Sequence, residues 1–207
     1  MKTNVYIDGF NFYYGSLKGT PHRWLDLDLF CRLMLPTNDI NQIKYFTALV
    51  TPRPHDPDQP IRQQAYLRAL RTLPNLSVVL GHFLAHPVRM PLANPQPNLP
   101  TYAVVLKVEE KGSDVNLATH LLWDGFRGDY DCAVVVTNDS DLLEPIRIVR
   151  QELKKKVGIL NPHKHPSQVL VRECDFFKTI RSGVLGASQF PPQLTDPHGT
   201  IVKPSSW

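Results

Sequence analysis

Residues 4–11 read Asn-Val-Tyr-Ile-Asp-Gly-Phe-Asn, and this stretch decides the fold. Its residues 5–7 are strand formers of the kind that fill a buried parallel strand. The strand runs directly into Asp8, and Gly9 allows a sharp turn after it. Asn11 follows three residues after Asp8, so a helix that begins here holds both side chains at one strand end. Because ligands of open α/β sheets gather outside the carboxyl ends of the strands, Asp8 is predicted to be either a helix N-cap or a ligand for a positive group.

Working outward from this stretch, apolar strand patterns alternate with helical ones. Strands are expected at 43–50, 76–84, 102–108, 132–137 and 156–160, helices at 26–35, 61–73, 115–123 and up to residue 155, and two short helical pieces within 167–180. The alternation predicts an α/β fold, a single domain with a mostly parallel central sheet flanked by helices. The proline-rich residues 86–100 are expected to form a connection, and a long hairpin tip is one form of it, because a strand pattern resumes at residue 102.

Two parts of the chain are distinguished by composition. Residues 1–183 are predicted to be the folded domain, and residues 184–207 a proline-containing tail with little periodicity that packs poorly alone. Either the body or a second chain is expected to hold this tail, so a homodimer is among the partners that we consider.

Length and composition are those of an ordinary globular protein with a slight positive charge. The 207 residues suffice for one α/β core, and a net charge of +4 fits a polyanionic partner. Three widely spaced cysteines without a CxxC pair favour a reducing compartment, so a cytoplasmic location is expected. The chain enters a strand without a signal peptide, and no apolar run approaches the ~20 residues that cross a membrane. We therefore predict no membrane partner.

Acidic residues recur where a strand or turn leads into a helix. They are Asp8, Asp114, and the pair Asp139 and Asp141. In a parallel sheet these junctions meet at one edge, where the carboxylates would repel one another unless a cation neutralised them. Hard divalent ions such as Mg²⁺ prefer oxygen ligands, and they suit phosphoryl or phosphodiester chemistry.

Helix capping is the alternative role for each acid. Asp141 and Glu144 have the spacing of a capping box, and Asp114 precedes a clean amphipathic helix. Asp8 is harder to explain as a cap because Gly9 separates it from the helix. Asp139 is in excess of what a cap needs, since Ser140 or Asp141 already supplies one. The set is therefore more informative than any single member.

Three segments match, in the same order, the motifs of a known family. They are residues 7–11, 110–115 and 137–142, and the Asp-aromatic segment at 174–177 is similar to the family's closing one. The chain thus resembles NYN-domain proteins, a branch of the PIN-like nuclease superfamily, over roughly residues 4–181. For the fold, the resemblance implies a single Rossmann-like (PIN-like) domain. The resemblance implies a Mg²⁺- or Mn²⁺-dependent nuclease that usually acts on RNA. Carried over, Asp8, Asp114 and Asp139 are the metal ligands, and Asn11 and Asp141 complete or orient the catalytic set.

Substrate contacts are expected beside these acids. Lys111 is the best candidate for a phosphate contact, although a solvated turn lysine is the simpler explanation. Asn138 and Ser140 are further substrate-binding candidates, and the expected partner is single-stranded RNA. The sequence departs from the family pattern at Phe10, where a small or polar residue is common, and at Asn138, where glycine is more usual.

Other functions remain to be weighed against the nuclease. The same fold could serve as a non-catalytic module that binds nucleic acid or protein. A haloacid-dehalogenase-like phosphohydrolase would need a second aspartate at position 10, which is Phe10. A dinucleotide-binding enzyme would need GxGxxG after the first strand, which the sequence lacks.

Overall fold

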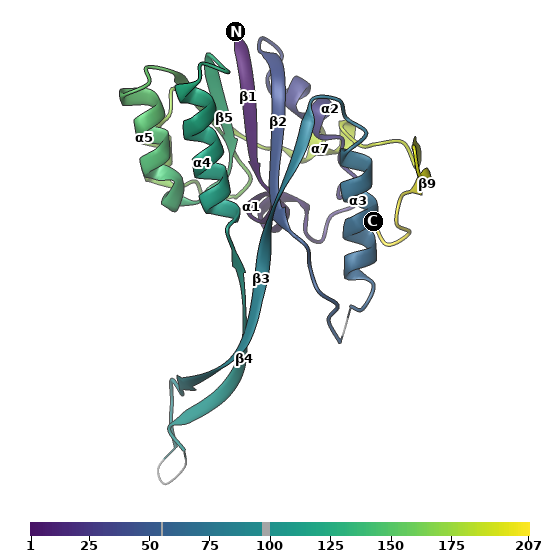
Figure 1. The fold of residues 1–207 in the computed structure, drawn as a ribbon, viewed down its shortest axis with the longest axis vertical. Helices are drawn as coiled ribbons and strands as arrows, with labels where there is room; N and C mark the ends of the chain where they lie inside the picture. Colours follow the sequence, from purple (N-terminus) through teal and green to yellow (C-terminus); the bar gives the residue numbers. More distant parts are fainter. Residues whose placement is uncertain (55, 97–99) are drawn as a thin grey trace.

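The computed structural model describes residues 1–54, 56–96 and 100–207 (Figure 1). Within them, the main sheet has seven strands in the order β4-β3-β2-β1-β5-β6-β7. The strands are β1 (Lys2–Asp8), β2 (Asp39–Ala48), β3 (Leu76–Pro91), β4 (Tyr102–Lys111), β5 (Cys132–Val136), β6 (Lys156–Asn161) and β7 (Phe176–Thr179). All neighbours are parallel except β3 and β4, which are antiparallel. The predicted α/β architecture with a mostly parallel sheet is confirmed.

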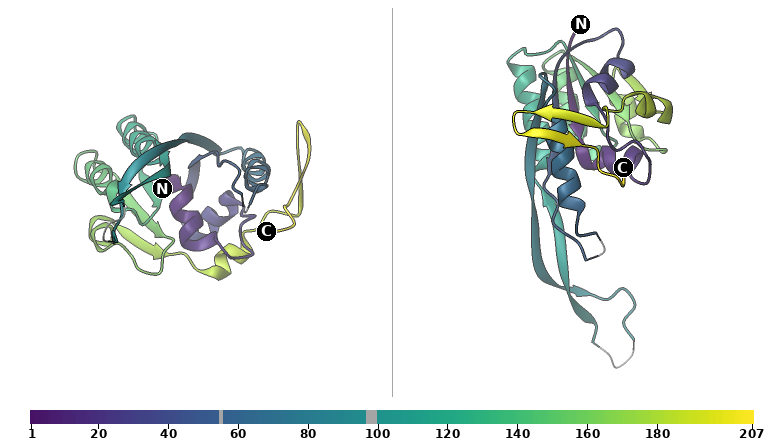
Figure 2. Two further views of the ribbon diagram at one scale, coloured as in Figure 1. Left: turned by 90° about the horizontal axis from the view of Figure 1, so that it is seen from below. Right: turned by 90° about the vertical axis from the view of Figure 1, so that its right-hand side faces the viewer.

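Helices cover both faces of this sheet (Figure 2). One face carries α1 (Gly9–Phe12), the π-helix η1 (Tyr13–Leu17), α2 (Leu27–Met34), α3 (Gln59–Leu70) and α7 (Ser182–Ala187). The other carries α4 (Ser113–Phe126), the 3₁₀-helix η2 (Ser140–Leu142), α5 (Leu143–Gln151) and α6 (Gln168–Glu173). The sheet therefore lies between two hydrophobic layers.

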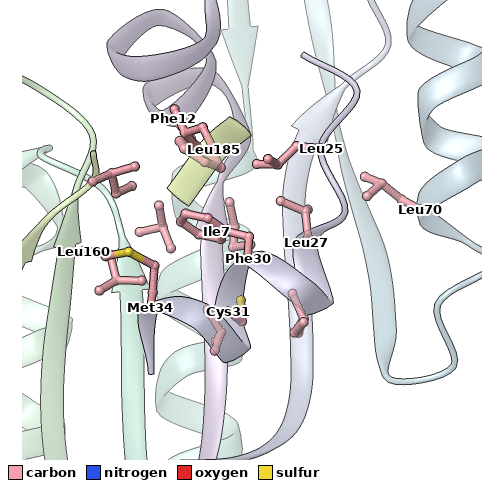
Figure 3. Packing of buried hydrophobic residues seen from close by; sticks show 14 of the residues in the cluster. Ile7, Phe12, Leu25, Leu27, Phe30, Cys31, Met34, Leu70, Leu160 and Leu185 are labelled. Atoms are coloured by element: carbon pink, nitrogen blue, oxygen red, sulfur yellow. The ribbon is translucent and has the colours of Figure 1, made fainter. Parts of the chain in front are cut away.

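The central strand β1 shows why the layers form. Its side chains alternate, so Ile7 joins the cluster with Phe12 and Phe30 (Figure 3), whereas Tyr6 joins the cluster under α4 and α5. The neighbouring strand β5 is buried along its whole length, as expected for an apolar strand in the middle of a parallel sheet. Between them, β1 and β5 fix the positions of Asp8 and Thr137.

A long hairpin extends beyond the body of the protein (Figures 1 and 2). Strand β2 accompanies β3 only to Gly81, and from there β3 pairs with β4 alone. We call residues 82–96 and 100–111 the arm. The predicted strand 76–84 was too short because Pro87 and Pro91 suggested a loop. In the two-stranded arm, the outer edge of β3 has no neighbouring strand. A proline there interrupts no hydrogen bond between strands, so it is tolerated.

Two further segments differ from expectation or add to it. The second predicted helical piece of 167–180 is instead strand β7, where Phe176 and Phe177 pair with β6. In the tail, β8 (Gln193–Asp196) and β9 (Gly199–Val202) form a hairpin that contacts α3, and Ile201 is buried. The body thus holds the tail, while the domain boundary at residue 183 stays a prediction. No helix in the described parts of the chain is both long and apolar enough to cross a membrane.

Candidate active site

Asp8 lies at the carboxyl end of β1 and is only 5% exposed. Its Oδ1 accepts a hydrogen bond from the backbone N–H of Asn11 at 3.0 Å, so it caps α1. Its Oδ2 accepts one from Thr137 Oγ1 at 3.2 Å, which draws it towards the end of β5. Burial raises the pKa of the Asp8 carboxyl to about 6, and the charges of Asp114 and Asp139 raise it further. Asp8 is therefore both a cap and a member of an acidic group.

Gly9 is required by the close packing next to Asp8. A Cβ at this position would lie 2.6 Å from Phe46 O and 2.8 Å from Tyr45 Cζ. Strand β2 thus brings the Tyr45 ring directly under the turn, where it lines the same cavity as Asp8. Burial, and then the charge of Asp8, raises the pKa of Tyr45, so its phenol stays neutral.

The loop after β5 is tied to the loop after β1. Thr137 Oγ1 accepts from the backbone N–H of Asp139 at 3.0 Å, besides donating to Asp8. Asn11 Oδ1 accepts from the backbone N–H of Asn138 at 2.9 Å. The end of β1 and the end of β5 are therefore held together through side chains, as the sequence predicted for Asp8 and Asp139.

The cap of η2 is Asp139 rather than Asp141. Asp139 Oδ1 accepts from the backbone N–H of Asp141 at 2.9 Å, whereas Asp141 is exposed. The expected capping box of Asp141 and Glu144 is not formed, because α5 begins after Leu142 without a side-chain cap. A 3₁₀ turn precedes α5 and shifts its start beyond Asp141, which leaves that carboxylate free for other contacts.

Asp114 is not a cap either. Helix α4 begins after Gly112, whose φ of 96° is left-handed, and Glu110 Oε1 accepts from both the backbone N–H and the hydroxyl of Ser113. Glu110 therefore satisfies the start of α4. The pKa of Asp114 is raised by partial burial and by the charges of Asp139, Glu110 and Asp141.

The antiparallel strand β4 still delivers Asp114 to the carboxyl edge of the sheet. The arm leaves the body at that edge and turns back, so β4 ends at Lys111 opposite His82, next to where β3 left. Asp114 follows directly in the first turn of α4. The predicted meeting of the acids is thus reached by a hairpin rather than by a third parallel strand.

A buried ion pair anchors α4 to the sheet from behind. Lys44 Nζ of β2 lies 2.6 Å from Asp124 Oδ2 of α4, and both side chains are less than 10% exposed. The hydroxyl of Tyr6 donates to the same Asp124 oxygen at 2.8 Å, and Lys44 Nζ is 3.1 Å from His120 Nδ1. This network fixes the helix that carries Asp114.

These elements surround a cavity of about 560 Å³, a size typical of sites for small organic ligands. Five carboxylates line it: Asp56, which is paired with Arg62, and a group formed by Asp8, Glu110, Asp114 and Asp139. Its aromatic lining includes Phe10, Tyr45, Tyr66, Phe83 and Trp207, and its basic lining includes Arg23, Arg53, Arg62 and His163. The cavity therefore combines an acidic group with planar and cationic side chains.

Three lining residues carry buried atoms without a hydrogen-bond partner in the described structure. They are Arg23 Nε, Gln59 Oε1 and His163 Nε2. Buried polar atoms normally find a partner, so these three are unsatisfied polar atoms of the cavity lining.

The carboxylate oxygens of the acidic group are suitable ligands for a divalent cation, but they do not form a complete coordination shell. Among the residues that the structure describes, no three His, Cys, Asp or Glu side chains are arranged to hold a metal as they lie. Mg²⁺, however, is usually held by one or two carboxylates and keeps several waters. Asp8, Asp114 and Asp139 could hold such an ion.

The predicted substrate-binding residues lie outside the cavity lining. Lys111 Nζ is 3.5 Å from Glu109, on the opposite face of the arm from Glu110. Asn138 uses its amide to donate to His165 O and to accept from the backbone N–H of Ser167. Ser140 is exposed at the start of η2. Their roles in substrate binding stay predictions.

Sequence reasoning missed three residues of the site. Glu110 stands within a quoted motif, and its position before Gly112 could have identified it. Thr137 closes an apolar strand and could have been noticed as the polar residue there. Tyr45 lies inside β2, and only the register of β1 against β2, which pairs Ile7 with Tyr45, brings it to Asp8.

Comparisons with known proteins agree with this architecture. The NYN domain family model matches residues 2–181. The chain is 33% identical, over 236 aligned positions, to 6-hydroxy-3-succinoylpyridine 3-monooxygenase HspA of Pseudomonas putida (strain DSM 28022 / S16), covering 100% of this chain and 75% of that protein. The crystal structure of a protein of unknown function, VPA0982 of Vibrio parahaemolyticus, is similar in fold, with a TM-score of 0.57 and 19% identity over 87% of this chain and 93% of that one. The chain belongs to the NYN domain family, a branch of the PIN-like nuclease superfamily.

Proposed function

We propose that this protein is a metal-dependent nuclease that hydrolyses phosphodiester bonds in single-stranded nucleic acid, RNA above all. The observation that supports this most is the grouping of Asp8, Asp114 and Asp139. They line one cavity, and the charges of the other two raise the pKa of Asp8. Such crowding is stabilised by a divalent cation.

Mg²⁺ or Mn²⁺ held by these three carboxylates would neutralise phosphate charge and lower the pKa of a water molecule. The protein itself holds the carboxylates in place. Thr137 and the Asn11 backbone hold Asp8, and the Asn11 side chain joins the two loops. Asp141, exposed beside them, adds negative charge to the group without lining the cavity.

The rest of the cavity suits a nucleotide. Its aromatic side chains offer faces on which unpaired bases can stack. Arg53 and Arg23 add positive charge for phosphate, and the net charge of +4 favours a polyanion. Stacking of this kind requires unpaired bases, so a single strand is the proposed substrate.

A second candidate is oxygenation of a small aromatic compound. The relative from Pseudomonas putida is named for 6-hydroxy-3-succinoylpyridine, and a planar ring with an acidic tail matches the aromatic and basic lining. In a monooxygenation one oxygen atom of O₂ enters the substrate and the other leaves as water, with two electrons from a reductant. This candidate requires O₂ and a reductant, whereas the nuclease requires neither.

One experiment separates the nuclease, the oxygenase and the non-catalytic binding module. Labelled single-stranded RNA and DNA are incubated with the protein with and without Mn²⁺. In parallel, 6-hydroxy-3-succinoylpyridine is supplied with O₂ and a nicotinamide reductant. Metal-dependent cleavage supports the nuclease, turnover of the pyridine supports the second candidate, and RNA binding without cleavage supports the binding module.

The variant Asp8→Asn assigns any cleavage to the site. We expect at least a roughly hundredfold loss, because Asn keeps the size of Asp and can still accept from the Asn11 backbone N–H, but it removes the charge that attracts the cation. The matched control is Asp129→Asn, a half-buried aspartate that precedes β5, at the amino ends of the parallel strands. Equal loss in both variants, or none in Asp8→Asn, would contradict the proposal.

A further inference from the structure

The arm exposes an unusual share of the protein's apolar surface. Of the twenty exposed large apolar side chains that the structure describes, eight lie on the arm. Val104 is 72% exposed, Leu106 70% and Val108 51%. Such side chains scattered singly need no explanation, but a contiguous group of them marks an interaction surface.

The arm also exposes backbone. Strand β4 is the last strand of the sheet, so in the described structure its outer edge has no neighbour. A two-stranded hairpin without cover is marginally stable in water. A long apolar edge strand is a template for pairing unless charges, bulges or another element block it. Residues 102–106 contain no charge, so nothing in this half of β4 prevents pairing.

We propose that two copies of this chain dimerise through their arms, with β4 pairing antiparallel to β4 of the second copy around a two-fold axis at Val105. The sequence of β4 is self-complementary in that register. It opposes Val104 to Leu106, Tyr102 to Val108, Ala103 to Lys107 and Thr101 to Glu109, so like charges never meet. An axis at Lys107 would instead set two lysines against each other.

The surface involved is sufficient for a dimer. Five of the eight exposed apolar side chains lie on β4 itself, and at about 50 Å² for each half-exposed one they offer roughly 250 Å² of apolar area per copy. With the polar atoms that accompany them, two copies remove on the order of 1,000 Å² from water, which is near the lower bound for specific association. Closed two-fold pairs are also the commonest assembly of identical chains.

The arm joins this surface to the cavity. At the base of the arm, Phe83, Val108 and Glu110 line the cavity. Side chains alternate along β4, so Val104 and Leu106 lie on the same face of the arm as Val108. The dimer surface is thus continuous with the cavity wall.

Charge substitutions in β4 test the register as well as the surface. Sedimentation of the full chain is measured from about 1 to 100 μM for the wild type and for two double variants. Val104→Glu with Leu106→Glu places like charges opposite each other and should weaken the dimer at least about tenfold. Val104→Glu with Leu106→Lys places opposite charges together and should retain it. Phe126→Glu, at an apolar residue that is also 72% exposed, is the control.

A disulfide crosslink tests the same pairing of β4 strands without placing charged side chains in the interface. Val105→Cys, made together with Cys174→Ser, should form a disulfide dimer under mild oxidation, because the two thiols meet at the axis; Cys31 and Cys132 are buried. Phe126→Cys in the same background should not. A wild-type chain that stays monomeric, or a dimer that the two-glutamate variant leaves unchanged, would overturn the proposal.

Discussion

The carboxyl ends of β1 and β5 and the arm are parts of the same sheet, but they differ in what they leave unsatisfied. At the strand ends, the polar side chains have partners within the chain: Asp8 bonds to Thr137 and Asn11, and Asn11 bonds to Asn138. What remains is excess negative charge. Along the arm the remaining groups are apolar side chains and an open strand edge. We therefore propose a cation as the partner of the first region and a second polypeptide as the partner of the second.

The largest effect is expected behind the site. Lys44→Met leaves Asp124 buried without its cation, and removing one partner of a buried ion pair costs about 3–5 kcal/mol. We expect a loss of that order in the free energy of unfolding, measured by urea denaturation. Lys107→Met, in an exposed pair on the arm, is the control and should change stability little. Similar losses in the two variants would remove the distinction between the rigid body and the arm.

A smaller effect concerns the charge of Asp8 itself. Because burial raises the pKa of Asp8 from 3.8 to about 6, the folded state binds this proton more tightly than the unfolded state. The stability that results is present below pH 4 and is lost as the pH rises through about 6. Asp8→Asn should therefore be more stable than the wild type at pH 7.5 by about 1–3 kcal/mol, and the difference should shrink towards pH 4.

Urea denaturation in EDTA at both pH values measures this difference. Asp114 and the other acids are present in both proteins, so the difference in stability between the wild type and Asp8→Asn reports on Asp8 alone. If Asp8→Asn were less stable than the wild type at pH 7.5, the carboxylate would be stabilised in the free protein, and no excess charge would await a cation.

The smallest effect lies where the two regions meet. Phe10 of α1 packs edge-on against Phe83 at the base of the arm, with ring centroids 5.7 Å apart. A double-mutant cycle of Phe10→Leu and Phe83→Leu should give a coupling energy of about 0.5–1.5 kcal/mol in unfolding. A coupling indistinguishable from zero would mean that the arm and the site are independent.

The sequence predicted the parts of this molecule that are specified locally. Strand β1, which ends at Asp8, and strand β5, which Asp139 follows three residues later, could be recognised because each contains an apolar run that leads to an acid. The role of each acid was harder to predict. Asp139 rather than Asp141 is the cap, because a 3₁₀ turn that the sequence does not mark precedes α5.

Long-range register was beyond sequence reasoning. Tyr45 reaches Asp8 only through the pairing of β2 with β1, and the arm reaches its full length despite Pro87 and Pro91 because its outer edge is open. The structure explains why Phe10 departs from the family pattern, because its ring packs on Phe83. The exposure of β4 could not be foreseen, because an apolar strand is ordinarily expected to be buried.

Calorimetric titration with Mn²⁺ tests the central claim most directly. The wild type should bind the ion, and Asp8→Asn, Asp114→Asn and Asp139→Asn should each bind it at least about tenfold more weakly. Asp129→Asn should bind it as the wild type does. Unchanged affinity in the three variants, or no binding by a folded wild type, would contradict the account.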